Sequence, residues 1–200
     1  MSATGSTLVK AANKATAKAL SKLVPSEIDT KGNKYTLEVK YASGLLKDEK
    51  DTCWEFLTTN MQALQVNYEA SPTMGWHPDK KKRELFHRLS RFILAYDNDS
   101  ALVAYTMFRF EFEEDENLVY CYELQVSPDI KRQGLGRVLM EQVKAIGEKY
   151  GMDKIMLTVF KANSEAVQFY ERNGFVTDPA CPSHDGGDES LEYRILSLEL

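Results

Sequence analysis

Two glycines at the start of a predicted helix form the most informative pattern in this sequence. In the segment VSPDIKRQGLGR, Gly134 and Gly136 join an apolar strand to an amphipathic helix. Glycine lets the backbone approach a ligand closely, and the unpaired N–H groups of a first helical turn attract phosphate. A GxG pair alone is common in tight turns, but a strand before it and a helix after it favour a phosphate-binding loop. Positive charge is added by Lys131, Arg132 and Arg137.

A second suggestive stretch is NSEAVQFYERNGF, over residues 163–175. Asn163 can cap a helix at its start, and Gly174 is placed to end it. A helix without a function would show the same features, so periodicity alone does not indicate an enzyme. Three residues at helical spacing predict its buried face: Ala166, Phe169 and Tyr170.

Acidic residues crowd a predicted strand end and hairpin: Glu111, Glu113, Glu114, Asp115 and Glu116. Such a run is usually a solvated turn. Glu111 and Glu113 nevertheless share one strand face, and paired carboxylates suit the planar guanidinium of an arginine. The pair is therefore a candidate for binding a basic side chain.

The overall composition favours a basic partner and argues against several other classes. A net charge of −5 and a pI near 5.4 do not suit a nucleic-acid binder, because phosphate contacts require a basic surface. Cys53, Cys121 and Cys181 lack paired metal spacing and suit reduced thiols, with a catalytic cysteine as the alternative. The sequence shows no secretory signal and no apolar run of about 18 residues. We therefore expect an intracellular protein without a metal or direct membrane or nucleic-acid contacts.

The length of 200 residues suits one domain with an N-terminal extension. Residues 8–24 predict an amphipathic helix that Pro25 ends, and we place the extension at 1–30 and the domain at 31–200. Its lysine stripe predicts a solvated surface, with a nuclear-import or ribosome-docking signal as the alternative. The predicted apolar side carries Leu8, Ala12, Ala15, Ala19 and Leu23, and the stripe carries Lys10, Lys14, Lys18 and Lys22.

The rest of the chain alternates between strand and helix patterns. A strand at 35–42 and a helix at 51–65 precede a short helix from Asp79, whose basic residues 80–83 we expect to be exposed. Three β-runs at 91–97, 101–113 and 118–126 predict an antiparallel meander. The remaining elements are a helix from Gly134, an apolar strand at 152–160, a helix at 163–173 and a closing strand at 191–200.

The glycine loop and the helix at 163–173 together resemble the acetyl-CoA-binding half of the GCN5-related N-acetyltransferase (GNAT) superfamily. The family pattern of Gln or Arg, two residues, glycine, one residue, and glycine or alanine falls on Lys131 through Gly136. Lys131 departs from it, but the loop binds chiefly through backbone amides. Asn-x-x-Ala-x-x-Phe-Tyr-x-x-x-Gly-Phe then follows from Asn163.

This resemblance implies an α/β (α+β) GNAT fold, in which helices flank a mixed, mostly antiparallel, twisted sheet. It also implies that acetyl-CoA is the acetyl donor and that no metal takes part. The residues matched to the acetyl-CoA site are Leu124, Gln125, Val126, Arg132, Gln133, Gly134, Leu135, Gly136, Arg137 and Asn163.

A narrower resemblance covers residues 35 to 197. The runs NMQ, FRF, LVYCYELQV, KRQGLG, KIMLTVFKAN and YRILS are similar to the NatD enzymes, N-terminal acetyltransferases selective for histones four and two-A, which begin Ser-Gly-Arg-Gly. The resemblance implies that the acceptor is the N-terminus of such a basic histone tail.

A catalytic assignment follows from that acceptor. An α-amino group has a pKa of about 7.7–8.0, so it must lose a proton before it can attack. Glu123 is the candidate base, with a structural ion pair as the alternative. Tyr122 and Tyr120 can orient the amine or a water. In a regular strand both would face away from Glu123, and a bulge would change that facing. The same bulge would free a backbone N–H near Leu124 or Val126 to bind the thioester oxygen. Tyr170 matches the family tyrosine that protonates the departing thiolate.

The same resemblance places Glu111 and Glu113 beside the third-position arginine of the peptide. Thr158 and Tyr193 can bond the peptide backbone, and Tyr68 falls in a stretch with an apparent insertion. The residues matched to the acceptor site are Glu111, Glu113, Tyr120, Tyr122, Thr158, Tyr193 and Tyr68.

Two other functions stay open at this point. The first is a GNAT enzyme that acetylates a lysine side chain or a small polyamine, and the second is a non-catalytic acyl-CoA-binding module. For the N-terminal acetyltransferase we expect a monomer in the cytoplasm and nucleus that binds histone tails and associates with ribosomes.

Overall fold

The computed structural model describes residues 6–61 and 75–200. Its eight described strands form one sheet in the order β1-β2-β3-β4-β5-β6-β8-β7. All neighbours pair antiparallel except β5 and β6, which are parallel. The strands are β1 (Glu27–Thr30), β2 (Asn33–Tyr41), β3 (Arg91–Tyr96), β4 (Leu102–Glu113), β5 (Glu116–Val126), β6 (Lys154–Phe160), β7 (Val176–Thr177) and β8 (Tyr193–Glu199).

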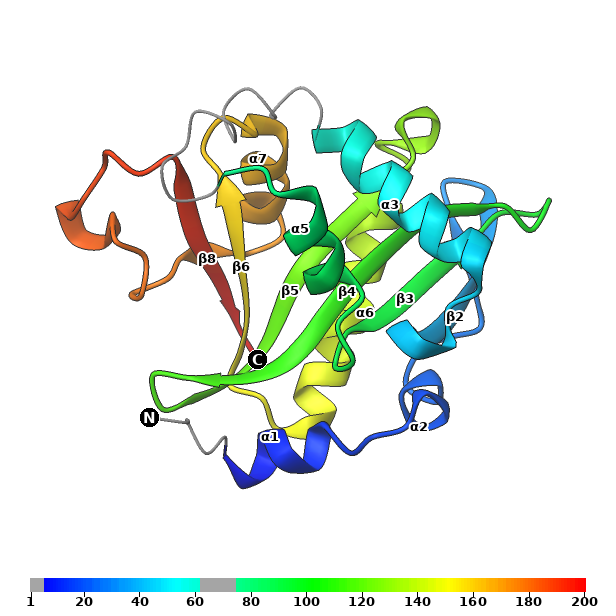
Figure 1. Ribbon diagram of the computed structural model, residues 1–200, viewed down its shortest axis with the longest axis horizontal. Coiled ribbons are helices and arrows are strands. Elements are labelled where there is room, and N and C mark those ends of the chain that lie inside the picture. The colour runs from blue at the N-terminus through cyan, green and yellow to red at the C-terminus, as the bar shows by residue number, and fades with distance from the viewer. Residues whose placement is uncertain (1–5, 62–74) are drawn as a thin grey trace.

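Helices cover both faces of the sheet, which gives three layers. Figure 1 shows α3 (Lys47–Met61) and α5 (Pro78–Leu85) in front of the sheet and α6 (Leu135–Tyr150) behind it. The face behind also carries α7 (Ser164–Arg172) and the N-terminal helices α1 (Thr7–Ala12) and α2 (Ala17–Ser21), whose buried residues join one core cluster with α6. Single 3-10 turns lie at η1 (Ala42–Gly44), η3 (Pro128–Ile130) and η4 (His184–Gly186).

Hydrophobic periodicity explains most of this arrangement. Helix α6 buries apolar residues at helical spacing, and Gly151 ends it in the left-handed conformation with φ of 67°. Strand β6 is mostly apolar, in keeping with the burial of six of its seven residues. The predicted meander is confirmed as β3, β4 and β5, and the other three predicted strands are confirmed as β2, β6 and β8.

The N-terminal extension differs from the single helix that its pattern predicts. The chain forms α1 and α2 with a break at residues 13–16, so the predicted apolar stripe is confirmed only in part: Ala12 and Ala15 are buried and Leu23 packs on the core, but Leu8 is 48% exposed. Ser6 and Thr16 cap the two helices, which gives each its own start. The buried residues are Val9, Ala12, Ala15 and Leu20.

Strand β1 was not predicted, and its pairing with β2 bears on the predicted boundary. Residues 27–30 pair with residues 33–36, so a boundary after residue 30 falls within a hairpin. The extension and the domain share one core. None of the helices in the described ranges is long and apolar enough to cross a bilayer.

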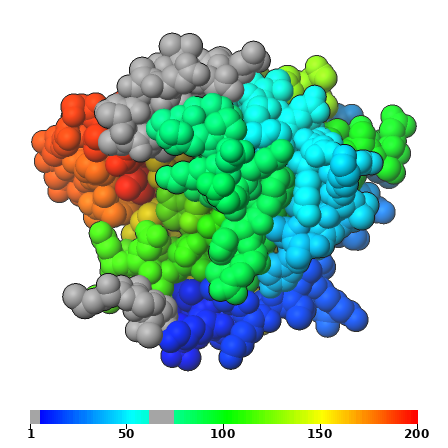
Figure 2. All heavy atoms as spheres, viewed as in Figure 1, coloured from blue at the N-terminus to red at the C-terminus, as the bar shows by residue number. Residues whose placement is uncertain are grey.

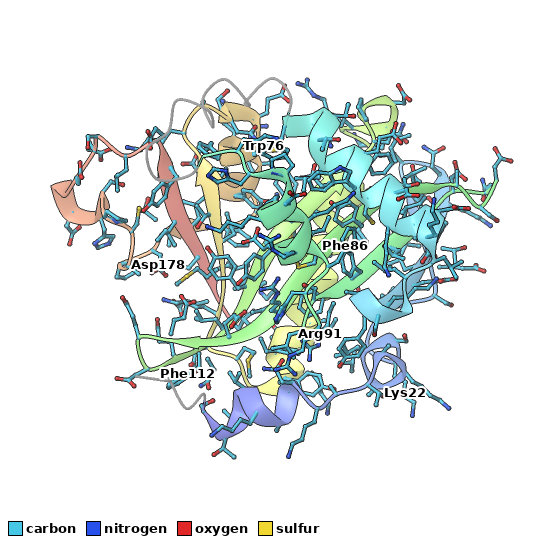
Figure 3. All side chains as sticks on the ribbon, in the orientation of Figure 1. Lys22, Trp76, Phe86, Arg91, Phe112 and Asp178 are labelled. Carbon is cyan, nitrogen blue, oxygen red and sulfur yellow. The ribbon has the colours of Figure 1, made fainter. Side chains whose placement is uncertain are left out.

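Arg91 ties the N-terminal segment to the sheet. Its side chain is fully buried, and Figure 3 shows it at the base of the sheet, near the N-terminal helices. The guanidinium donates to the carbonyl oxygens of Leu89 at 2.8 Å and Asn13 at 3.3 Å. It also lies 5.0 Å from the ring centre of Tyr41 and 4.9 Å from that of Phe110.

We expect Arg91→Met to lower the free energy of unfolding by about 1–3 kcal/mol, because buried carbonyls would lose their donor. Urea denaturation measures the change. Arg88→Met, at an exposed neighbouring position, should change the stability by less than about 0.5 kcal/mol. Equal stability of the two variants would contradict this role for Arg91.

Candidate active site

The parallel strands β5 and β6 separate after a short pairing. Their register covers Leu118–Tyr120 against Lys154–Met156, although β5 continues to Val126 and β6 to Phe160. Figure 1 shows the two strands diverging toward the end that carries α7. The edge of β5 beyond Tyr120 therefore has no strand partner on the β6 side within the described part of the chain. Such an edge can pair with an extended, amide-bearing ligand.

The predicted glycine loop lies where β5 leads into α6. Gly134 has φ of 91° and takes the N-cap position of α6, where no side chain caps the first turn. The first-turn N–H groups are thus available to an anion, as the sequence predicts. Gly136 faces α7, and a Cβ there would make an ordinary contact, 3.6 Å from the ring of Phe169. This cradle fits the diphosphate of a nucleotide cofactor such as CoA.

The β1–β2 hairpin supports the loop, which the sequence did not suggest. Thr30 donates from Oγ1 to the carbonyl of Gln133 at 2.8 Å, and Lys31 donates from Nζ to the carbonyl of Arg132 at 2.7 Å. The Gln133 side chain accepts from Asn33 at 2.7 Å, so it faces the hairpin. Any contact of Gln133 with a cofactor would therefore use its backbone.

The other residues matched to the cofactor site surround this cradle. Arg132 and Arg137 are exposed and pair with Glu165 at 2.8 Å and Glu141 at 2.9 Å. Asn163 caps α7, accepting at Oδ1 from the N–H of Ala166 at 3.2 Å, as predicted. Leu135 is buried at the start of α6, and Leu124 and Val126 pack on the α6 side of β5.

Gly134→Val should weaken CoA binding strongly, by about tenfold or more. A branched side chain at φ of 91° is strained by about 1–3 kcal/mol, and its Cβ would lie 2.6 Å from Oγ1 of Thr30. Calorimetry with CoA measures the affinity. Gly186→Val is the matched control, because Gly186 has φ of 80° with open space around it. Unchanged affinity of a folded Gly134→Val variant would show that CoA binds elsewhere.

A β-bulge brings the catalytic candidates to one face. Along β4 and β5, Met107 pairs with Glu123 but Phe108 pairs with Cys121, so Tyr122 is the extra residue. As a result Tyr122 and Glu123, adjacent in sequence, both face the α5 side, while Cys121 contacts Met140 of α6 behind the sheet. A regular strand would have placed Tyr122 and Glu123 on opposite faces. The strand thus contains a bulge of the kind that a shared role for Tyr122 and Glu123 requires.

Glu123 lies in a buried polar network. Its side chain is 7% exposed; Oε1 lies 2.9 Å from Nζ of Lys81, and Oε2 accepts from Nε2 of Gln125 at 2.8 Å. Gln125 in turn accepts from Nδ2 of Asn60 in α3 at 2.9 Å. The Gln125 side chain therefore belongs to this network and not to the cofactor cradle.

Lys81 was wrongly predicted to be exposed with its neighbours. It contacts both Glu123 and Glu84, whose Oε2 lies 2.6 Å from Nζ. Burial alone would lower the pKa of Lys81, but the two carboxylates outweigh it and hold the pKa above its ordinary value. Helical phase was the missed signal, because Lys81 lies one turn before the buried Leu85.

Tyr122 is held from two sides. The guanidinium of Arg109 lies 4.2 Å from its ring centre, and its hydroxyl donates to Oε1 of Glu111 at 3.3 Å. The ring of Tyr120 lies beside it, tilted by 47°, with ring centres 4.7 Å apart. Oxygen atoms of Tyr120 and Thr158 lie 2.6 Å apart, which connects the predicted acceptor residues across the β5–β6 fork.

An acidic recess of about 160 Å³ adjoins these tyrosines. Partial burial, with the charges of Glu111 and Glu114, raises the pKa of Glu113. Glu116 is paired with the buried Lys154, so Glu113 and Glu114 remain the carboxylates open to a ligand cation. The recess is lined by Glu113, Glu114, Glu116, Tyr120, Met156, Ala180 and Ile195.

The remaining candidates divide by location. Tyr170 is buried among Phe169 and Phe175 on the α6 side, and burial raises its pKa well above the ordinary value. Tyr193 pairs with Phe160 at the start of β8, two residues before Ile195 of the recess. Tyr68 lies outside the described residues.

Two further expectations concern cysteines and metals. Burial raises the pKa of the Cys121 thiol to about 12, so this cysteine beside the site is not a thiolate nucleophile at neutral pH. Within residues 6–61 and 75–200, no group of three His, Cys, Asp or Glu side chains is arranged to hold a metal ion.

Comparison with known proteins identifies the family. Residues 57–175 match the acetyltransferase (GNAT) family. The ribosomal protein bS18-alanine N-acetyltransferase of Escherichia coli K12 is 34% identical over 74 residues, which cover 35% of this chain and 50% of that protein. A mycothiol acetyltransferase of Geodermatophilus obscurus is 30% identical over 122 residues, or 60% of this chain and 40% of that protein. The chain spans half the length or less of these two relatives.

A solved structure of the NatC complex bound to Gag peptide and CoA superposes with a TM-score of 0.57 at 16% identity, covering 83% of this chain and 98% of that one. This likeness concerns the fold alone. The chain belongs to the acetyltransferase (GNAT) family and has its fold, with helices flanking a mixed, mostly antiparallel sheet. Acetyl-CoA is the co-substrate of this family, in agreement with the predicted cradle at Gly134.

Proposed function

We propose that this protein is an N-terminal acetyltransferase that moves an acetyl group from acetyl-CoA to the α-amino group of a protein beginning Ser-Gly-Arg-Gly, as histones four and two-A do. One observation carries the proposal. A buried carboxylate and two tyrosines meet at the β5–β6 fork, next to an acidic recess that suits a basic peptide.

Acetyl-CoA would lie along the free edge of β5, with its diphosphate at the α6 N-terminus and its acyl thioester supplied at the fork. The acceptor amine would enter from the α5 face, where Glu123 takes its proton and Tyr122 orients it. Tyr170 keeps its proton at neutral pH because burial raises its pKa. Its match to the family tyrosine supports it as the proton donor to the leaving sulfur, from the opposite face of the sheet.

The acceptor class is supported by charge and by relatives. Glu111 and Glu113 share the α5 face of β4, and a carboxylate can bind the guanidinium of an arginine through two parallel hydrogen bonds. The E. coli relative is named for acetylating an alanine of a ribosomal protein. We therefore prefer a protein acceptor over one related to mycothiol, which the name of the other relative contains.

The decisive experiment compares two peptides that begin Ser-Gly-Arg-Gly. One has a free N-terminus. The other has a blocked N-terminus and carries one internal lysine as the alternative acceptor. Mass spectrometry should find acetyl only on the free α-amine. Acetylation of the lysine, or of spermidine at an equal rate, would support the alternative of a side-chain or polyamine acetyltransferase. CoA binding without transfer to any of these amines would support a non-catalytic module.

A further inference from the structure

An ion pair between the partly exposed Lys81 and the buried Glu123 joins helix α5 to the bulged strand β5. Nζ of Lys81 lies 2.9 Å from Oε1 of Glu123, and only 7% of the glutamate side chain is exposed. Three elements hold this carboxylate, because Gln125 of β5 donates to its other oxygen and is itself bound by Asn60 of α3. The carboxylate is thereby fixed in one orientation.

Lys81 also bonds to a second partner on its own helix. Its ammonium lies 2.6 Å from Oε2 of Glu84. The backbone carbonyl of Glu84 accepts from Nη2 of Arg109, the residue that stacks on Tyr122. One turn of α5 thus holds both Glu123 and Tyr122, the two groups to which the proposed function gives roles at the acceptor amine.

We propose that Lys81 is a positioning residue of the transfer reaction, whose ammonium balances the charge of the buried Glu123 carboxylate and aims it so that it can take the proton of the acceptor amine. The proposal rests on the proposed function, because it takes Glu123 as the proton acceptor. A buried carboxylate without a cation holds a proton more tightly, and a protonated carboxylate cannot accept another.

Among the groups that the structure describes around Glu123, Lys81 is the one placed to balance the charge of its carboxylate. Within the described residues it is the cation in ion-pair contact with Glu123, while Arg109 is engaged by Ser90, Glu84 and Tyr122. The neighbouring hydroxyl and thiol groups are neutral at physiological pH, since burial raises their pKa values. The titratable groups around Glu123 are Lys81 and Glu84 of α5, Tyr105 and Arg109 of β4, Cys121 and Tyr122 of β5, and Tyr170 of α7.

The test measures kcat/KM of Lys81→Met and of the wild type from pH 5.5 to pH 9 with one peptide. The ratio of the two values is free of the peptide's own ionisation, which affects both proteins equally. Because an adjacent opposite charge shifts a carboxylate's protonation by about 1–3 pH units, the variant's deficit should be about tenfold or more larger at the acid end. A ratio that is constant across the range would overturn the proposal.

Three further variants separate charge from structure. Lys81→Arg keeps the cation and should keep the wild-type pH profile, whereas a profile like that of Lys81→Met would overturn the proposal. Lys80→Met, at an exposed position of the same helix, should leave the ratio at one. Glu84→Gln leaves the ammonium to Glu123 alone and should raise relative activity toward acid pH. This variant tests the proposal even if Lys81→Met fails to fold, and a fall toward acid pH would count against it.

The outcome is separable from the proposed function. Transfer to the α-amine by the wild-type protein tests the function, and only the pH dependence of the variant ratios tests Lys81. A wild-type protein that acetylates the α-amine while Lys81→Met shows a flat ratio would therefore remove Lys81 from the mechanism and leave the function standing.

Discussion

Glu123→Gln should lower kcat about 10²–10⁴-fold near neutral pH, the contribution expected of a general base. The amide keeps the size of the carboxylate and can still bond Gln125, but it cannot take a proton from the acceptor. The deficit should shrink as the pH rises toward the α-amine's own pKa of about 7.7–8.0, where the amine needs no base. Initial rates at saturating acetyl-CoA and peptide, from pH 6 to pH 9, measure both effects.

The control must address the ion pair with Lys81, because the substitution also removes a charge from α5. Glu84→Gln removes the other carboxylate that contacts the same ammonium, at 2.6 Å. If Glu123 served only to neutralise Lys81, the two variants would lose similar activity. A general base predicts that Glu84→Gln keeps most turnover. Unchanged CoA affinity of Glu123→Gln would show that its cofactor cradle is intact, and a fully active Glu123→Gln would place the base elsewhere.

The elements of the cofactor half were predictable because their signals are local. The glycine loop, helix α6 and the Asn163 cap each depend on residues within one or two turns of each other. Strands β3 to β6 were predictable for a similar reason, since each has a continuous β-prone run bounded by turns.

The acceptor half was less predictable because its features depend on contacts between distant segments. The bulge at Tyr122 follows from the pairing of β4 with β5, and no residue in the run LVYCYELQV marks it. Lys81 stands among four consecutive basic residues, and only its packing against β5 distinguishes it. Arg91 stands at the start of an apolar strand. Its burial depends on hydrogen bonds to the carbonyl oxygens of Ala12 and Asn13, which are distant in the sequence.

Support of the loop by the β1–β2 hairpin illustrates the same limit. Thr30 and Lys31 bond the carbonyls of residues about a hundred positions later, which is beyond the reach of any local pattern. The assignment of residues 1–30 to a separate extension depended on the break at Pro25. Helix α2 already ends at Ser21, and after Pro25 the chain enters the sheet that carries the site.

Selectivity for arginine should depend on Glu111 and Glu113. Combining Glu111→Ala with Glu113→Ala should lower kcat/KM strongly for a peptide with arginine at the third position and hardly at all for one with alanine there. Truncating one side of a desolvated charged pair costs about 2–5 kcal/mol, whereas an exposed pair contributes at most about 1 kcal/mol. The magnitude of the loss therefore shows whether the arginine is desolvated between the two carboxylates or lies in solvent near the hairpin.

The control removes charge from the hairpin tip outside the recess. Asp115→Ala changes an exposed carboxylate that does not line the recess, so it reports the long-range field alone, and raised salt should abolish its smaller effect. A loss for Asp115→Ala equal to that of the double variant on the arginine peptide would mean that the acidic hairpin attracts basic tails without reading the third residue. Equal losses of Glu111→Ala with Glu113→Ala on the arginine and alanine peptides would mean that these carboxylates stabilise the fold.

A pH dependence gives the arginine assignment an independent check. The pKa of Glu113 is raised by partial burial and by the neighbouring charges of Glu111 and Glu114. Glu113 should thus lose its negative charge at a higher pH than an ordinary glutamate as the solution is acidified, while an arginine stays protonated. The preference for the arginine peptide over the alanine peptide should then decline on acidification. Both peptides have the same α-amine and use the same base, so their ratio reports only the arginine contact, and a ratio that stayed constant down to pH 5 would exclude Glu113 from that contact.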